Sequence, residues 1–123
     1  MLLAEDNDLN AELAAILLED SEMIVTRAAD GQEVADLFAN HPAGTYDIIL
    51  MDIMMPKMDG LQAAKAIRAM QAERPDAEEI PIIALSANAF AEDVQTSLDA
   101  GMNGHVSKPL NVAEVAKVIA RNL

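Results

Sequence analysis

Residues 48–60 of the chain read IILMDIMMPKMDG, an apolar run that ends in a single carboxylate, Asp52. A continuous apolar run is typical of a strand buried on both faces, as in a parallel sheet. Asp52 would then stand at the carboxyl end of that strand, where an open α/β sheet has its ligand crevice. Asp52 could equally open the turn that carries Pro56 and Gly60, since aspartate is a common turn residue. Residues elsewhere in the chain are needed to choose between a functional role and a turn role for Asp52.

The composition indicates one domain, which we place at residues 1–123, and 52% hydrophobic residues predict a packed core. The sequence lacks cysteine, which excludes thiolate metal sites and fits a reducing, cytoplasmic compartment. No apolar run approaches the ~20 residues of a membrane span. With 21 acidic against 8 basic residues the net charge is −13, which argues against direct nucleic-acid binding and favours basic partners or a metal cation.

Hydrophobic periodicity predicts strands and helices in strict alternation along the chain. The expected strands are 1–4, 23–28, 47–51, 82–85 and 104–107. Helices are expected at 8–19, around 34–38, at 60–73, through 94–98 up to Gly101, and after Asn111, with a polar loop at 74–79. Such an order is typical of a doubly wound parallel sheet with helices on both faces.

Polar side chains follow four of the five predicted strands. Glu5 and Asp6 follow the first, Asp52 the third, Ser86 the fourth and Lys108 the fifth. If these strands are neighbours, three carboxylates meet at one rim of the sheet, and a divalent cation would relieve their mutual repulsion. Oxygen ligands favour Mg²⁺. A carboxylate beside Mg²⁺ can attack phosphorus to form an aspartyl phosphate, with the hydroxyl and the ammonium as partners for the phosphoryl oxygens.

Four short motifs occur here in the order and spacing of a known family: Glu-Asp-Asn at 5–7, the segment 52–60, Ser-Ala-Asn-Ala at 86–89 and Lys-Pro at 108–109. The chain resembles the receiver domain of two-component response regulators over essentially its whole length. The resemblance implies a flavodoxin-like fold with strand order 2-1-3-4-5 and five helices on two faces. It also implies that a phosphohistidine on a histidine kinase or a histidine phosphotransfer protein is the phosphodonor.

The resemblance further assigns roles to the acidic residues. Asp52 is implied as the phosphoacceptor. Asp6, Asp52 and the backbone carbonyl of Met54 are implied as direct Mg²⁺ ligands, and Glu5 is implied to act through a metal-bound water. The motif at 5–10 and the end of the chain also resemble receivers attached to hybrid sensor kinases, so the parent protein could be a hybrid histidine kinase.

Beyond the metal, the resemblance implies that Lys108 pairs with the phosphoryl group and that Ser86 is the switch hydroxyl. His105 stands where receivers usually carry the Tyr or Phe that swings inward during switching. It is either a half-exposed strand histidine or a rotameric switch with pH sensitivity, because imidazole changes charge near neutral pH. The expected readout surface comprises the fourth helix, the fifth strand and the fifth helix, and a phosphorylation-dependent dimer is left open.

Three other functions fit these residues less well than a phosphorylatable switch does. An aspartyl-phosphate phosphatase of the haloacid-dehalogenase kind would need a second Asp two residues after the nucleophile, but residue 54 is Met. A flavodoxin would need a phosphate loop after the first strand, and the acidic residues at 5–8 would repel a phosphate. A docking module that takes no phosphate is disfavoured by the complete set of acids, Ser86 and Lys108. We therefore expect no enzymatic activity beyond self-phosphorylation and autodephosphorylation.

Overall fold

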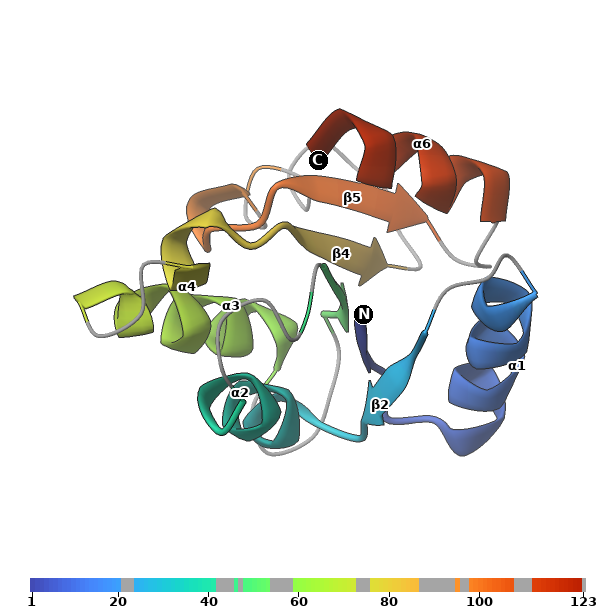
Figure 1. Cartoon of the computed structure of the whole chain (residues 1–123), viewed down its shortest axis with the longest axis horizontal. Helices are drawn as coiled ribbons and strands as arrows, with labels where there is room; N and C mark the ends of the chain where they lie inside the picture. Colours follow the sequence, from blue (N-terminus) through green and yellow to red (C-terminus); the bar gives the residue numbers. More distant parts are fainter. Residues whose placement is uncertain are drawn as a thin grey trace.

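The chain is built around a five-stranded parallel sheet with strand order β2-β1-β3-β4-β5 (Figure 1). The computed structural model describes residues 1–20, 24–41, 46, 48–53, 59–72, 76–86, 95, 98–107 and 112–122. The strands are β1 (Leu2–Ala4), β2 (Thr26–Ala28), β3 (Ile49–Asp52), β4 (Ile82–Ser86) and β5 (Gly104–Ser107). The predicted fold class and the strand order implied by the resemblance are both confirmed.

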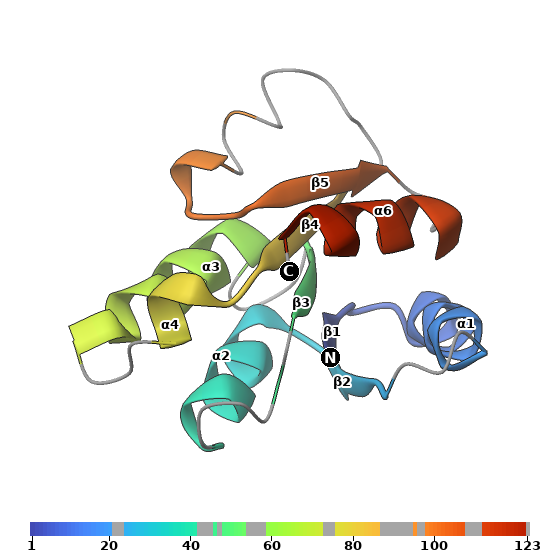
Figure 2. The same ribbon diagram turned by 45° about the horizontal axis from the view of Figure 1, so that its top comes forward.

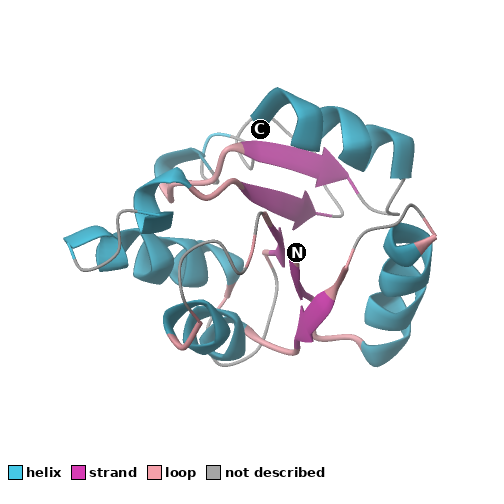
Figure 3. Cartoon of the chain, in the orientation of Figure 1, coloured by secondary structure: helices cyan, strands magenta, loops and turns pink. Residues whose placement is uncertain are grey.

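Helices cover both faces of the sheet (Figures 1 and 2). One face carries α1 (Asp8–Glu19) and α6 (Val112–Asn122), and the other carries α2 (Gly31–Ala39) and α3 (Gly60–Arg68). Two short elements follow α3, the 3₁₀ helix η1 (Ala69–Ala72) and α4 (Asp76–Glu79), as the helix colouring of Figure 3 shows.

The prediction of a polar loop at 74–79 is wrong for residues 76–79, which form α4. Ala77 in this helix is fully buried, and its carbonyl accepts a hydrogen bond from the Arg68 guanidinium at 3.0 Å. The same guanidinium donates to the Gly101 carbonyl at 2.9 Å and to Oδ1 of Asn103 at 2.7 Å. A tertiary clamp therefore stabilises a helical turn that is too short to show a periodic pattern in sequence.

Each face of the sheet has its own hydrophobic core, because alternate side chains of a strand point to opposite faces. On the α2 and α3 side the buried strand residues are Leu2, Ala4, Ala28, Ile49, Met51, Ile82 and Ala84. On the α1 and α6 side they are Leu3, Leu50, Ile83, Leu85 and Val106. The central strands are thus buried on both faces, as the run at 48–51 predicted.

The helix predicted at 8–19 is confirmed, and Asn7 is its N-cap, accepting from the Asn10 amide. Its apolar stripe nevertheless lies in solvent. Ala11, Ala14 and Leu18 face the sheet, whereas four larger apolar side chains are 41–64% exposed: Leu9, Leu13, Ile16 and Leu17. The structure therefore leaves a large apolar surface uncovered on α1.

Both helices on the opposite face begin at an aspartate cap. Asp30 accepts from the Glu33 amide, and Gly31 is the first residue of α2. Asp59 and Gln62 form a reciprocal capping box at α3. Asp59 therefore fixes the start of the helix that follows the β3 loop.

Candidate functional site

Three carboxylates meet at the carboxyl edge of the sheet. One oxygen each from Glu5, Asp6 and Asp52 lies within 4.8 Å of the other two. Parallel pairing sets Ala4 of β1 beside Met51 of β3, so the residues that follow these two emerge next to each other. Glu5 is 3% and Asp52 4% exposed, whereas Asp6 is exposed. The structure thus brings together the three acids that the sequence places after β1 and in β3.

The main chain at the end of β3 is fixed by two backbone hydrogen bonds of Ile53, the residue after Asp52. The amide of Ile53, the next residue, donates to the Leu85 carbonyl of β4 at 3.2 Å. The Ile53 carbonyl accepts from the Gly60 amide at 2.9 Å, and this bond holds the start of α3 against the end of β3. Asp52 therefore sits on a rigid element, as a preorganised ligand or nucleophile requires.

Arg27 of β2, which was not among the predicted site residues, supports the acidic loop, residues 5–7 between β1 and α1. Arg27 donates from Nη2 to the carbonyls of Glu5 at 2.9 Å and Asp6 at 3.3 Å, and from Nε to Glu5 at 3.2 Å. Its Nη1 pairs with Oδ1 of Asp8 at 2.8 Å. The available signal was that Arg27 is the single basic residue within the predicted strand 23–28.

The donor set fits a hard divalent cation. Burying two carboxylates beside a third is costly unless a positive charge faces them. Carboxylate oxygens from Glu5, Asp6 and Asp52 are ligands that Mg²⁺ accepts, and nitrogen or sulfur ligands that would favour zinc or copper are missing from the described acidic cluster. The residues present are therefore compatible with the Mg²⁺ that the resemblance implies.

The remaining predicted residues lie on the neighbouring strands or outside the described residues. Ser86 ends β4, one residue beyond Leu85, the register partner of Asp52, and its side chain is outside the described part. Lys108 and Met54 also lie outside the described residues. His105 lies on β5, half-buried, and its buried Nε2 has no hydrogen-bond partner within the described chain.

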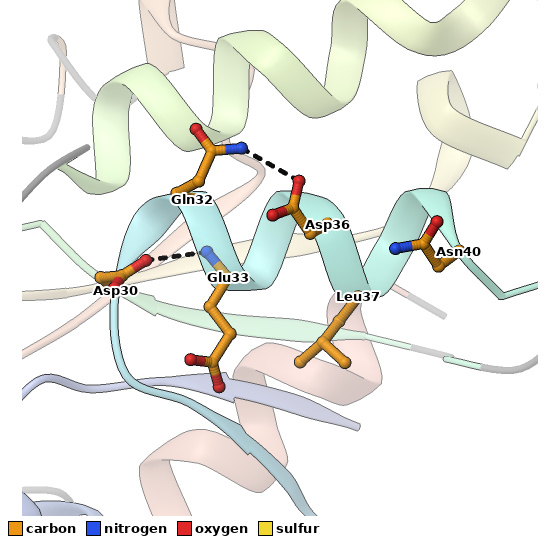
Figure 4. Close-up of a pocket in the computed structure, with 6 residues that line it drawn as sticks. All are labelled: Asp30, Gln32, Glu33, Asp36, Leu37 and Asn40. Carbon is orange, nitrogen blue, oxygen red and sulfur yellow. Dashed lines mark hydrogen bonds between the residues drawn. The ribbon is translucent and has the colours of Figure 1, made fainter.

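A hollow lies along α2 (Figure 4). Its polar groups serve the helix itself: Asp30 caps the Glu33 amide, and Gln32 donates to Asp36 at 2.9 Å. Those contacts leave no convergent set of groups for chemistry. The acidic cluster is therefore the candidate functional site. Among helices in the described residues, none combines the length and apolar character needed to cross a membrane.

Comparison with known proteins gives consistent matches. A family model described as "Response regulator receiver domain" matches residues 1–120. The sensor protein GacS of Pseudomonas syringae pv. syringae is 36% identical over 121 residues, which cover 98% of this chain and 13% of the relative. The chain thus spans a small part of that curated relative.

Two solved structures are similar over nearly the whole chain. The first is the receiver domain of sensor histidine kinase PA1611 from Pseudomonas aeruginosa PAO1, with a magnesium ion coordinated in the active site cleft. It has a TM-score of 0.84 at 36% identity and covers 98% of this chain and 93% of that one. The second belongs to the co-crystal of the Saccharomyces cerevisiae phosphotransfer protein Ypd1 and the receiver domain of Ssk1. Here the TM-score is 0.86 at 27% identity, with 98% and 86% of the two chains covered.

Proposed function

Because the chain belongs to the family of response regulator receiver domains, we propose that it is a phosphorylatable switch whose phosphoacceptor is Asp52. The observation that carries the proposal is the cluster of Glu5, Asp6 and Asp52, in which two buried carboxylates and an exposed one lie within 4.8 Å. The phosphodonor is a phosphohistidine on a histidine kinase or a histidine phosphotransfer protein. The GacS and Ssk1–Ypd1 comparisons support this class of partner.

The reaction is a transfer of one phosphoryl group. An oxygen of the Asp52 carboxylate attacks phosphorus, the phosphorus–nitrogen bond of the donor breaks, and the imidazole keeps the electron pair and takes up a proton. Glu5, Asp6, Asp52 and the carbonyl of Met54 would hold Mg²⁺. When bound, Mg²⁺ supplies charge neutralisation for the phosphoryl oxygens. The magnesium ion named for the PA1611 receiver supports this assignment.

Lys108, Ser86 and His105 complete the proposed switch. Lys108 would pair with the phosphoryl group, and the Ser86 hydroxyl would follow it. The altered surface would comprise the helix predicted through 94–98 up to Gly101, which lies largely outside the described residues, together with β5 and α6, with His105 as the rotameric element. Residues 1–123 would form one receiver unit that acts in the cytoplasm and catalyses only its own phosphorylation and dephosphorylation.

We place donor docking on the exposed apolar side of α1. This helix begins directly after the acidic loop, and Leu9 and Leu13 on its first turns are 64% and 52% exposed. An apolar surface of this kind beside a reactive site suits a protein partner. The occupant we propose is the phosphodonor protein, because its phosphohistidine must reach Asp52 at the same edge of the sheet.

Intact-mass spectrometry after incubation with acetyl phosphate and Mg²⁺ tests the proposal. The parent chain and Asp99→Asn, which alters an exposed carboxylate distant in sequence, should each gain one phosphoryl group, and Asp52→Asn should gain none. A gain in all three proteins would show that another group is the acceptor. No gain in the parent, with Mg²⁺ binding demonstrated, would favour the docking module that takes no phosphate.

A further inference from the structure

Hydrogen bonds from β2 fix both the amide and the carbonyl of Glu5 in the acidic loop. The Glu5 amide donates to the Ala28 carbonyl at 3.0 Å, and the Glu5 carbonyl accepts from two nitrogens of Arg27, at 2.9 and 3.2 Å. The Asp6 carbonyl accepts from the same guanidinium at 3.3 Å. The carbonyls of Glu5 and Asp6, the two loop residues of the acidic cluster, are thus both fixed by the Arg27 guanidinium.

We propose that Arg27 is a positioning residue for the Mg²⁺ site: it fixes the Glu5 and Asp6 backbone so that both carboxylates face Asp52. This inference rests on the proposed function, because it takes the acidic cluster to be the metal site. Register pairs Arg27 with Leu3, so its side chain lies on the α1 side of the sheet, where the acidic loop passes into α1. Arg27 therefore acts on the cluster through backbone atoms and touches no proposed ligand oxygen in the described contacts.

The ion pair with Asp8 is a weaker explanation for the role of the Arg27 side chain than its contacts with the loop carbonyls. Asp8 is 93% exposed and the Arg27 side chain 33% exposed, and pairs of this kind contribute little to stability. The carbonyl contacts are more specific, because the guanidinium presents several donors in a rigid fork that a lysine ammonium does not reproduce. The pair with Asp8 instead offsets the charge that Arg27 brings close to the site.

Charge and positioning predict opposite effects when Arg27 is removed. Arg27 is a cation near a proposed cation site, so Coulomb repulsion alone predicts that Arg27→Gln binds Mg²⁺ more tightly. Loss of positioning predicts weaker binding, because supporting contacts behind metal ligands typically contribute 10- to 100-fold to metal affinity. We expect about a tenfold weaker Mg²⁺ affinity for Arg27→Gln. The sign of the change therefore decides between the two roles.

The test is a calorimetric Mg²⁺ titration of the full chain and four variants. Lys65→Gln is the matched control, because it removes the same charge from an exposed position on α3. Arg27→Lys keeps the charge and loses the fork, and we expect it to weaken binding severalfold. Asp8→Asn breaks the ion pair and keeps the carbonyl contacts, and we expect affinity within about twofold of the parent. Circular dichroism checks that each variant is folded.

A second readout does not depend on the metal. Amide hydrogen exchange of residues 5–8, measured by NMR without Mg²⁺, should be faster in Arg27→Gln than in Lys65→Gln. If Arg27→Gln bound Mg²⁺ as tightly as Lys65→Gln, or more tightly, the inference would be overturned. If the parent bound no Mg²⁺, the proposed metal site would fail, and the exchange data would decide separately: faster exchange supports Arg27 as the support of this loop, and unchanged exchange overturns it.

Discussion

Gly60, the first residue of α3, lies directly against the backbone of Asp52 at the end of β3. A Cβ at position 60 would overlap the Asp52 carbonyl oxygen and lie 2.9 Å from the Cα of Ile53. The close approach allows the Gly60 amide to donate to the Ile53 carbonyl at 2.9 Å. Glycine is therefore required here by space, because α3 begins directly against the buried end of β3.

Replacing Gly60 with alanine should destabilise the protein by about 1–3 kcal/mol, the usual cost of overpacking a tight contact. Helix propensity alone predicts the opposite sign, since alanine is favoured over glycine in helices by about 1 kcal/mol. Urea denaturation of Gly60→Ala measures the difference. Lys65→Ala, at an exposed position of the same helix, controls for propensity, and a stabilised Gly60→Ala would contradict the predicted backbone clash.

Asp52→Asn should stabilise the metal-free protein, because it removes one of three carboxylates that lie within 4.8 Å of one another. Repulsion between two unit charges at such a distance is on the order of 1–4 kcal/mol, depending on the local dielectric. We expect a gain of about 1 kcal/mol in the free energy of unfolding, measured by thermal denaturation in a chelator. Asp99→Asn is the control, and a melting temperature that falls in Asp52→Asn would count against charge crowding.

Mg²⁺ should raise the melting temperature of the parent chain, because it binds the assembled acidic cluster and not the dispersed carboxylates of the unfolded chain. At a free Mg²⁺ concentration 100 times Kd the gain is about 2.7 kcal/mol. The shift should disappear when Asp6 and Asp52 are both changed to asparagine and should persist in Asp99→Asn. Equal Mg²⁺ shifts in all three proteins would place the cation elsewhere.

The sequence predicts most of the fold and the acidic part of the site for the same reason. Buried parallel strands give continuous apolar runs, and a residue that directly follows such a run has to lie at the carboxyl edge of the sheet. Glu5, Asp6 and Asp52 were therefore identifiable before their distances were known.

Other features depend on tertiary relations that a single sequence does not encode. Arg27 was missed because its contacts require the register between β2 and β1. Periodicity groups Leu9, Leu13, Ile16 and Leu17 on one face of α1 but cannot tell whether the sheet covers that face, and here Ala11 and Ala14 take the inner side. Helix α4 was missed because four residues carry too little periodicity to be recognised.

His105→Phe should increase the free energy of unfolding by about 1 kcal/mol, because it replaces a buried nitrogen that lacks a partner in the described chain. His41→Phe is the matched control at the second histidine. Nδ1 of His41 donates to the Leu37 carbonyl at 2.7 Å, so the same change there should destabilise. Thermal denaturation of both variants gives the comparison, and destabilisation of both would indicate that the His105 ring makes a polar contact of its own.

Changing Leu9 and Leu13 to glutamine should slow phosphotransfer from a protein donor without affecting phosphorylation by acetyl phosphate. Both side chains are more than half exposed, so the folded state loses little packing. Partner affinity depends on apolar anchors that become buried in the complex, and a loss of about 1.4 kcal/mol would reduce the transfer rate about tenfold at subsaturating donor. Phosphorylated yeast Ypd1 serves as the protein probe, with transfer followed by mass spectrometry.

The small-molecule arm separates docking from chemistry, since acetyl phosphate reaches Asp52 without a protein surface. Leu98→Gln is the matched control, because Leu98 is 47% exposed on the segment before β5, which we assign to readout instead of docking. It should leave both transfer rates unchanged. Equal slowing with Ypd1 and with acetyl phosphate would mean that the α1 changes disturb the acidic loop at the start of the helix. Full transfer from Ypd1 to the α1 variant would instead remove α1 as the docking surface.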